Sequence, residues 1–406
     1  MKQFDVVVIG GGPAGLSASL ECAKSNLKVL LIERNPFLGG ILQQCIHNGF
    51  GLHYFKEELT GPEYAYRFIE KVESNSNITV LTNTFVTNIN GKAVTFTNKN
   101  GVKKVKCKAL ICAMGCRERT ASNIFLTGTR PAGVYTAGAV QKMVNIYGKL
   151  PGKNVVILGS GDIGLIMARR LKTEGANVIG VYEINPQTSG LRRNVVQCLN
   201  DFNIPLHLGT TVTEVVGDNR VQGVYIANVD ENYNVIEKTR KFVQCDCLVL
   251  SVGLVPEMDL LDKLPYNKST KSTFVNEYLE TQQDGVFLCG NMLHVHDLVD
   301  NVTLEGEQAG KNAVLYVKNA LQKFKQYKVL CGNNISYVVP NTVYENDEKT
   351  VLKFRVKNKC SKCNIVVKCG EKVVFKKYIL ATLPGEMNVI TLSKKDINSD
   401  IILEVE

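Results

Sequence analysis

Three glycines near the start of the chain have the types and spacing that bind a dinucleotide. Gly10, Gly12 and Gly15 follow the apolar run 6–9 and precede a segment with helical character. Glycine lets the backbone turn tightly and bring the N–H groups of a helix N-terminus close to a pyrophosphate. Glu33 ends a second apolar strand, where its carboxylate can accept hydrogen bonds from a ribose. The pattern predicts a strand, a turn and a helix that together hold a dinucleotide.

The same pattern returns in the middle of the chain. The apolar run 155–158 is followed by a glycine turn and then by an acid at the end of the next strand. The turn residues are Gly159, Gly161, Asp162, Ile163 and Gly164, and the acid is Glu183. Each copy is followed by a β-rich insert and by an apolar strand that leads into a glycine, Gly115 in the first copy and Gly253 in the second. A repeat on this scale predicts two nucleotide-binding domains, one inserted in the other.

Elements of these kinds must be positioned by an α/β fold. We expect two Rossmann-like domains, the second inserted in the first. From about residue 330 the chain changes to short β runs separated by Gly, Asn and Lys, which predicts a small C-terminal antiparallel β-domain. The expected domains are 1–120 with 265–325, then 121–264, and finally 326–406.

Composition and charge are those of an ordinary globular protein. The 406 residues are 45% hydrophobic and 21% charged, and the net charge of +10 comes mostly from scattered lysines. No basic stripe with interleaved aromatic residues favours nucleic-acid binding. No apolar run reaches the roughly 18 residues of a membrane span, and the first strand begins near residue 6. We therefore expect a cytoplasmic protein without a transmembrane segment.

Thirteen cysteines are present, an odd number at irregular spacings. In a reducing compartment, most are expected to be small buried hydrophobic residues. The pair Cys360 and Cys363, with Cys331 and Cys369, offers four sulfurs, but the second C-x-x-C of a typical zinc site is missing. We expect no metal.

The two glycine patterns, their β-inserts and the segment 286–291 resemble those of two-dinucleotide-domain flavoprotein oxidoreductases, the pyridine nucleotide-disulfide oxidoreductase-like proteins. The resemblance covers residues 1 to about 325. It implies FAD in the first domain, NAD(P)H in the second, and hydride transfer between the nicotinamide and the flavin. The FAD contacts it implies are Gly10, Gly12, Pro13, Ala14, Gly15, Glu33, Gly40, Ala113, Gly115, Gly290, Asn291 and Thr303. The NAD(P)H contacts it implies are Gly159, Gly161, Asp162, Ile163, Gly164, Glu183 and Gly253.

The resemblance raises two questions, namely how Asn291 would contact FAD and whether the second domain would bind NADH or NADPH. Asn291 stands where the family usually has an aspartate near the ribityl chain, and its amide can still bind hydroxyl groups. A helix beginning near residues 301–303 would direct its positive end at the flavin. Glu183 would repel a 2′-phosphate and so favours NADH over NADPH, while Arg192 and Arg193 leave NADPH open.

A closer resemblance is carried by segments 39–50, 115–119 and 291–297. They are similar to a bacterial subgroup that accompanies flavin-dependent glycerol-3-phosphate dehydrogenase-like proteins. They also resemble the FAD/NAD-type subunits of multi-subunit amine, opine and proline dehydrogenases. This implies a partner dehydrogenase or another electron-transfer subunit, and it leaves an oligomer open.

The redox-active cysteine pair of the wider family is missing at both usual places. Leu42 and His47 occupy the positions of the pair in glutathione-reductase-like members. Residues 131–158, where thioredoxin-reductase-like members carry a C-x-x-C, contain no cysteine. Disulfide reduction by such a pair is therefore disfavoured.

The remaining candidates for chemistry are single side chains. Cys45 lies two residues before His47, so the imidazole could lower the pKa of the thiol. His294 and His296 alternate on a segment expected to be extended. We therefore expect them to face opposite sides and not to bind one metal together. One of them, oriented by Asp297, is a candidate proton donor or acceptor at the flavin.

The sequence thus predicts an FAD-dependent oxidoreductase that exchanges hydride with NAD(H) and electrons with a partner or a small acceptor. A first alternative is a single-cysteine disulfide or peroxide reductase or NADH oxidase centred on Cys45. A second is a non-catalytic dinucleotide-sensing assembly protein. The presence of two complete nucleotide patterns argues against the second alternative.

Overall fold

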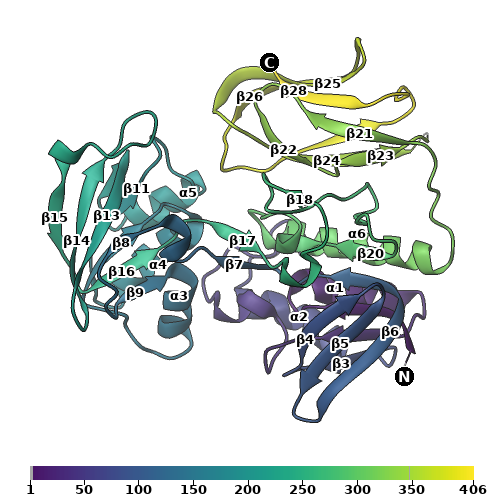
Figure 1. The fold of residues 1–406 in the computed structure, drawn as a ribbon, viewed down its shortest axis with the longest axis horizontal. Helices are drawn as coiled ribbons and strands as arrows, with labels where there is room; N and C mark the ends of the chain where they lie inside the picture. The colour runs from purple at the N-terminus through teal and green to yellow at the C-terminus, as the bar shows by residue number, and fades with distance from the viewer. Residues whose placement is uncertain (1–2, 347) are drawn as a thin grey trace. The chain divides into compact units, whose positions relative to one another are not determined.

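The computed structural model describes residues 3–346 and 348–406 and divides into two compact units. The first unit contains Met1–Cys116 and Pro256–Glu406, and the second contains Arg117–Val255 (Figure 1). Short strands lie where the chain passes between them, namely β7 (Cys116–Glu118) and β17 (Leu254–Pro256). None of the described helices has the length and apolar character to cross a membrane.

A mainly parallel sheet organises the first unit. Its strand order is β3-β2-β1-β6-β5-β4, and β20 pairs with β6. Residues 6–9 of β1 are buried, as expected of an apolar strand covered on both faces. β5 pairs antiparallel with both β4 and β6. The strands are β1 (Gln3–Ile9), β2 (Val29–Ile32), β3 (Ile78–Leu81), β4 (Phe85–Asn90), β5 (Ala93–Asn98), β6 (Gly101–Cys112) and β20 (Val286–Leu288).

Two of the helices of this unit lie unusually close together. These are α1 (Pro13–Lys24) and α6 (Val299–Val317). A Cβ on Gly306 of α6 would lie 2.3 Å from the Ala14 carbonyl oxygen, so only glycine allows this approach. The third helix, α2 (Gly61–Glu73), begins with a capping box in which Thr60 and Glu63 bond reciprocally.

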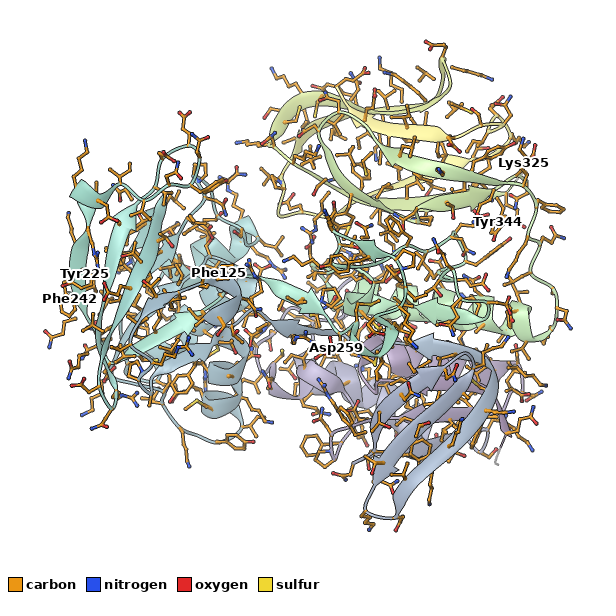
Figure 2. All side chains as sticks on the ribbon, viewed as in Figure 1. Phe125, Tyr225, Phe242, Asp259, Lys325 and Tyr344 are labelled. Carbon is orange, nitrogen blue, oxygen red and sulfur yellow. The ribbon has the colours of Figure 1, made fainter. Side chains whose placement is uncertain are left out.

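The second unit repeats the α/β plan. Its parallel sheet has the order β12-β11-β10-β16-β9, and a second sheet has the order β15-β14-β13-β8. Tyr225 and Phe242 lie beside each other on the second sheet, with ring centroids 5.3 Å apart (Figure 2). The helices are α3 (Ala137–Asn145), α4 (Asp162–Thr173) and α5 (Arg192–Val195). The strands are β8 (Thr127–Gly128), β9 (Val134–Thr136), β10 (Asn154–Leu158), β11 (Asn177–Glu183), β12 (Leu206–Leu208), β13 (Thr210–Gly217), β14 (Val221–Asn228), β15 (Lys241–Gln244) and β16 (Cys247–Leu250).

The C-terminal residues form a β-sandwich within the first unit. Its sheets have the orders β23-β21-β28-β25-β26 and β22-β24-β27, around a core that includes Phe354, Val367 and Leu403. The pairing is antiparallel except between β21 and β28. The strands are β21 (Gln326–Cys331), β22 (Ile335–Val339), β23 (Thr342–Tyr344), β24 (Lys349–Val356), β25 (Cys360–Cys369), β26 (Lys372–Thr382), β27 (Asn388–Ser393) and β28 (Ile401–Val405). Two short strands, β18 (Tyr266–Asn267) and β19 (Ser272–Thr273), precede it.

The predicted fold class is confirmed. Two nucleotide-binding-type sheets and a C-terminal β-domain are present, although the sandwich has one parallel pairing that the sequence did not indicate. The precise limits of the functional domains stay a prediction.

Candidate functional site

The first glycine turn is shaped by two close contacts and one opening. Gly10 has φ +106°, and a Cβ there would lie 2.3 Å from the Ala113 carbonyl oxygen. A Cβ on Gly15 would lie 1.8 Å from the Gly10 carbonyl oxygen, so glycine is what brings α1 this close to β1. A Cβ on Gly12 would instead meet no atom within 4 Å. Since Pro13 begins α1, the open side of Gly12 lies at a helix N-terminus, where an anion is favoured.

Glu33 lies directly beside this turn. It is 5% exposed, and its carboxylate oxygens accept hydrogen bonds from the Gly11 N–H at 2.7 Å and from the Asn35 N–H at 2.7 Å. A carboxylate offers about four acceptor positions, so further hydroxyl donors can bind. Gly40, with φ +56°, brings its backbone close to Gly12. These features fit the pyrophosphate and ribose of a bound dinucleotide.

The far edge of the first site contains Ala113 and Gly115. Ala113 is nearly buried against the turn, and a Cβ on Gly115 would meet no atom within 4 Å. Gly290 lies against α1, since a Cβ on it would be 2.9 Å from Ala14 Cβ. The predicted FAD contacts from the N-terminal turn and from the late Gly-Asn segment are therefore neighbours.

The second glycine turn uses Ser251 in place of an alanine carbonyl. Gly159 has φ +94°, and its Cβ would lie 2.2 Å from the Ser251 carbonyl oxygen. The Ser251 hydroxyl accepts a hydrogen bond from the Gly164 N–H at 3.1 Å. On the Gly161 side the space is narrower than over Gly12, because a Cβ would lie 3.0 Å from Ser251 Oγ. Gly253, with φ +100°, accepts a hydrogen bond from the Arg119 N–H at 3.0 Å.

Glu183 occupies the same place in the second copy as Glu33 in the first. One of its oxygens accepts the Ser160 N–H at 2.9 Å, the Ser160 hydroxyl at 2.6 Å and the Ser189 hydroxyl at 3.0 Å. The other oxygen accepts both the N–H and the side-chain amide of Asn185, at 3.0 and 2.6 Å. The carboxylate is therefore more fully satisfied by protein than Glu33 is, and a ribose would have to replace one of the hydroxyl donors.

Each copy contains the same additional backbone hydrogen bond. The Gly39 N–H donates to the Gly11 carbonyl at 2.8 Å, and the Gly190 N–H donates to the Ser160 carbonyl at 2.9 Å. Sequence reasoning missed Ser160 as a contact of the terminal acid, although its place between Gly159 and Gly161 was visible.

The other predicted NAD(P)H contacts lie around the start of α4. Asp162 accepts hydrogen bonds from the Leu191 N–H at 2.8 Å and from the Asn194 side chain at 2.7 Å, and so fixes α5. Ile163 packs against the core of the domain. Arg192 and Arg193 are exposed on α5.

The two histidines converge on one carboxylate, so the expectation that they face opposite sides is wrong. His294 Nε2 lies 2.9 Å from one Glu305 oxygen, and His296 Nε2 lies 3.0 Å from the other. The ring centroids are 4.3 Å apart. Side chains alternate only on an extended strand, whereas residues 290–292 form a 3-10 turn and the chain then bends before α6.

Glu305 is fully buried on α6 and binds four donors. Besides the two histidines, it accepts the Gly290 N–H at 2.8 Å and the Lys353 ammonium at 2.7 Å. Burial alone would raise the pKa of Glu305, but Lys353 and the histidines hold that pKa well below its usual range. Burial lowers the pKa of His294 to about 4, so this ring is neutral at neutral pH. Among the described residues, neither His294 Nδ1 nor His296 Nδ1 has a hydrogen-bond partner.

The cluster has the spacing of a metal site but not its charge. One ligating atom from each of His294, His296 and Glu305 lies within 4.8 Å of the others. Lys353 already places a cation against the carboxylate, so the residues fit an ion-pair network rather than a metal centre.

Asp297 does not orient a histidine. Its carboxylate forms an ion pair with Arg355 of β24 and accepts the Met387 N–H at 2.7 Å. The predicted orienting role is therefore wrong, because the β-sandwich supplies the partner of this acid. Asn291 also has a local role, since its side-chain oxygen accepts the His296 N–H at 3.0 Å.

Thr303 lies inside the helix packing rather than on its surface. It is fully buried, and its hydroxyl shares a hydrogen bond with the Tyr64 hydroxyl at 2.7 Å. Its carbonyl accepts the Ser17 hydroxyl at 2.9 Å. α6 begins at Val299, slightly earlier than expected. A direct contact between Thr303 and FAD stays a prediction.

Cys45 and His47 follow the 3-10 helix Gly40–Gln44. The Cys45 thiol donates to the Ile41 carbonyl at 3.3 Å, and His47 Nδ1 lies 3.0 Å from the Asn48 carbonyl oxygen. The His47 ring packs on Phe50 with centroids 4.9 Å apart. A catalytic role for either stays a prediction.

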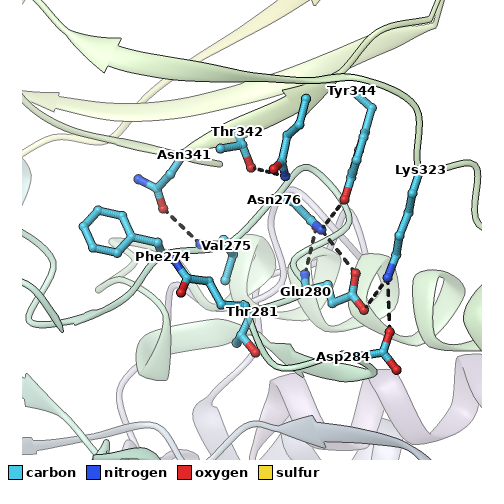
Figure 3. A pocket seen from close by; sticks show the side chains of 12 residues that line it. Phe274, Val275, Asn276, Glu280, Thr281, Asp284, Lys323, Asn341, Thr342 and Tyr344 are labelled. Atoms are coloured by element: carbon cyan, nitrogen blue, oxygen red, sulfur yellow. Dashed lines mark hydrogen bonds and ion pairs between the residues drawn. The ribbon is translucent and has the colours of Figure 1, made fainter. Parts of the chain in front are cut away.

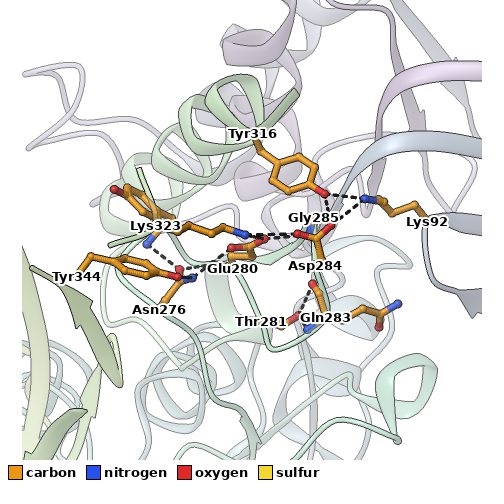
Figure 4. A network of polar contacts seen from close by, with 11 residues as sticks. Lys92, Asn276, Glu280, Thr281, Gln283, Asp284, Gly285, Tyr316, Lys323 and Tyr344 are labelled. Carbon is orange, nitrogen blue, oxygen red and sulfur yellow. Dashed lines mark hydrogen bonds and ion pairs between the residues drawn. The ribbon is translucent and has the colours of Figure 1, made fainter. Parts of the chain in front are cut away.

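A separate cavity of about 280 Å³ lies between the segment 274–284 and the strands β21 and β23 (Figure 3). Its polar side chains bond to each other: Lys323 lies 2.9 Å from Glu280, and Asn276 lies 3.2 Å from both Glu280 and the Tyr344 hydroxyl. Figure 4 shows the network extending through Asp284 and Tyr316. This is a structural junction between the sandwich and the nucleotide-binding part of the unit.

Residues 4–322 match the protein family described as pyridine nucleotide-disulphide oxidoreductase, over most of the chain and both glycine turns. The chain belongs to this family. It is an oxidoreductase with the family's FAD and NAD(P) fold, and membership implies both FAD and a nicotinamide cofactor. Leu42 and His47, and the cysteine-free residues 131–158, stand where the resemblance would place a redox cysteine pair.

Similar proteins within and around this family include enzyme subunits and reductases. The chain is 26% identical to the hydrogen cyanide synthase subunit HcnB of Pseudomonas protegens over 71% of this chain and 66% of that protein. It is 22% identical to a ferredoxin–NADP reductase of Picrophilus torridus, over 78% and 94% of the two chains. The Lactococcus lactis thioredoxin reductase structure matches with a TM-score of 0.65 at 21% identity, over 78% and 99%. The chain thus spans about two thirds of the length of HcnB.

Proposed function

We propose that this oxidoreductase binds FAD at the first glycine turn, takes hydride from NADH bound at the second, and passes the electrons to a partner subunit. The observation that carries the proposal is the open space at Gly12 beside the Glu33 carboxylate, which accepts two backbone N–H groups and can accept further donors. An opening at a helix N-terminus beside a ribose acceptor is what a dinucleotide requires.

FAD would supply hydride acceptance at its flavin ring, and the protein residues hold and orient it. The N-terminus of α1 would bind the pyrophosphate, and Glu33 would accept hydrogen bonds from the adenosine ribose. Gly290 and Asn291 would lie along the ribityl chain, and the N-terminus of α6 would face the edge of the flavin where negative charge grows on reduction.

We propose NADH as the preferred reductant. Glu183 is buried at the ribose position of the second copy, where a second negative charge on a 2′-phosphate would be repelled. The exposed Arg192 and Arg193 are the residues that would favour NADPH. Initial rates with each nucleotide decide this, and an Arg192→Ala/Arg193→Ala variant should change the rate with NADPH but not with NADH.

The partner is proposed to be another dehydrogenase subunit. The similarity to HcnB, a protein named as a subunit, supports a multi-subunit assembly. The closer resemblance to proteins that accompany glycerol-3-phosphate dehydrogenase-like flavoproteins suggests glycerol 3-phosphate as the partner's substrate: it would be oxidised if electrons ran from the partner to NAD⁺, and formed from dihydroxyacetone phosphate if they ran from NADH to the partner. Affinity purification from the native cell, followed by assay with glycerol 3-phosphate, tests both suggestions.

The central experiment is an anaerobic titration of the purified protein with NADH. The flavin absorbance should be present at one FAD per chain and should bleach on addition of one equivalent of NADH. A protein without flavin, or flavin that neither NADH nor NADPH bleaches, contradicts the proposal.

The Cys45 alternative is separated by one variant. A reductase or oxidase centred on this thiol requires that Cys45→Ser abolish turnover with a disulfide, peroxide or oxygen while flavin reduction continues. The contact of the thiol with the Ile41 carbonyl is the geometry that the same variant would remove. We expect Cys45→Ser to keep both activities.

A further inference from the structure

The C-terminal sandwich brings two cations to the nucleotide-binding part, Arg355 to the loop 290–297 and Lys353 to Glu305 of α6. Lys353 and Arg355 lie on the same face of β24, because side chains two residues apart point the same way on a strand. The alternating residues Leu352, Phe354 and Val356 are buried in the sandwich core. Lys353 binds Glu305, and Arg355 binds Asp297 and the Val295 carbonyl. The loop from Gly290 to Asp297 is thus fixed by the sandwich.

Glu305 joins this loop to α6. One oxygen accepts the Gly290 N–H at 2.8 Å and contacts His296, whose own N–H holds the Asn291 side chain. The Gly290–Asn291 turn is therefore oriented through the Glu305 carboxylate. Any change in the charge or position of that carboxylate is transmitted to the turn.

Lys353 is the cation that balances Glu305. The carboxylate has no exposed surface, the Lys353 side chain is only 15% exposed, and their charged atoms are 2.7 Å apart. A buried carboxylate that loses its cation is left with an uncompensated charge, which is strongly unfavourable. His294 is neutral at neutral pH and does not replace the lysine.

We propose that Lys353 is a positioning residue of the flavin site, and that the C-terminal β-sandwich is a structural part of this site rather than a separate module. The proposal rests on the proposed FAD site, since Gly290 and Asn291 are there assigned to the ribityl chain. Lys353 acts through Glu305: it neutralises the buried charge of that carboxylate and holds the turn. Without it, the unbalanced carboxylate disfavours the extra electrons of reduced flavin, so the reduction potential falls.

The main test compares two variants of Lys353 in the full-length FAD-bound protein. Lys353→Met should shift the ratio of oxidised to reduced flavin at fixed potential at least tenfold toward oxidised, about 30 mV for a two-electron couple. Lys353→Arg, which keeps the charge, should restore the ratio to within about threefold of the wild type. Potentials are measured by equilibration with reference dyes, together with FAD content and thermal unfolding.

A matched control is available in the same junction. Lys394 is also buried, and its ammonium lies 2.7 Å from both oxygens of Glu277, so it too joins the sandwich to the nucleotide-binding part. Lys394→Met should lower the thermal midpoint without changing the potential. An equal change of potential in Lys394→Met would show that loss of docking alone is responsible, and would overturn the proposal.

A second variant covers the case in which Lys353→Met does not fold. Glu305→Gln leaves the Lys353 charge in place without its anion, so it should raise the potential, opposite in sign to Lys353→Met. A double variant removes both charges and should return the potential toward that of the wild type. Unchanged potentials in flavin-loaded variants, or shifts of Glu305→Gln and Lys353→Met in the same direction, contradict the role of Lys353. A wild-type protein without flavin contradicts instead the proposed function.

Discussion

Gly12→Ala separates cofactor binding from folding more cleanly than any other change in the first turn. The added methyl group would meet no protein atom within 4 Å, and Gly12 has φ −78°, which alanine adopts readily. Reduced freedom of the unfolded chain stabilises the variant by about 0.4–1 kcal/mol. Alanine is a poorer N-cap than glycine by a similar amount, about 0.5–1 kcal/mol. These effects offset each other, so the stability of the flavin-free protein should change by less than about 1 kcal/mol.

Flavin binding should respond strongly to the same change. The methyl group would occupy the space proposed for the pyrophosphate, and forcing a methyl into a filled site typically costs about 1–3 kcal/mol. This corresponds to a roughly 5- to 150-fold weaker FAD affinity. The assays are urea unfolding of the flavin-free protein and quenching of FAD fluorescence on binding.

The control for this experiment is Gly15→Ala. Its methyl group would lie 1.8 Å from the Gly10 carbonyl oxygen, so that variant should lose stability before any cofactor is added. The reasoning is refuted if Gly12→Ala binds FAD as tightly as the wild type. It is also refuted if the flavin-free Gly12→Ala protein is destabilised as much as Gly15→Ala.

Three further predictions concern ionisable side chains that are buried or half-buried. Glu33→Gln loses a charged acceptor facing the Gly11 N–H, and FAD should bind about tenfold more weakly or worse in a fluorescence titration; an unchanged affinity would remove Glu33 from the site. Asp297→Asn leaves Arg355 without its anion, and the free energy of unfolding in urea should fall by about 3 kcal/mol, whereas a loss below about 1 kcal/mol would show the pair to be dispensable. Burial lowers the pKa of His294 from its usual 6.5 to about 4, so the unfolded chain binds more protons than the folded chain between these pH values. The free energy of unfolding should therefore be full above pH 6.5 and fall by roughly 2 kcal/mol at pH 5. His294→Asn should flatten this part of the pH profile of urea unfolding, and an unchanged profile would show that another group causes it.

The parts of the fold that follow from local sequence were predictable. The apolar strands 6–9 and 155–158, each followed by a glycine turn, set two α/β domains because a short buried strand and a tight turn are encoded by adjacent residues. The register of Glu33 beside the first turn follows from the same βαβ unit. Comparison with the family then supported the fold over most of the chain.

The histidine cluster could not be predicted, because its contacts join distant parts of the chain. Glu305 and Lys353 are 48 residues apart in sequence, and neither carries a local motif. The alternation rule failed for His294 and His296 because it requires an extended strand, and the sequence contains no feature that announces the 3-10 turn at 290–292. The sequence placed Asp297 beside a histidine because the two are neighbours in the chain, whereas its partner Arg355 lies 58 residues later, in the C-terminal β-sandwich.

The same turn contact occurs twice, from the Gly39 N–H to the Gly11 carbonyl and from the Gly190 N–H to the Ser160 carbonyl. Each copy can therefore serve as the control for a substitution in the other. A substitution at one copy has a counterpart at the other within the same chain, at the same concentration and in the same preparation. Gly12→Ala and Gly161→Ala, measured side by side for FAD and for NADH, would report how one backbone design was fitted to two ligands. The hydroxyl of Ser160, which the first copy lacks, is the natural place to begin exchanging one binding preference for the other.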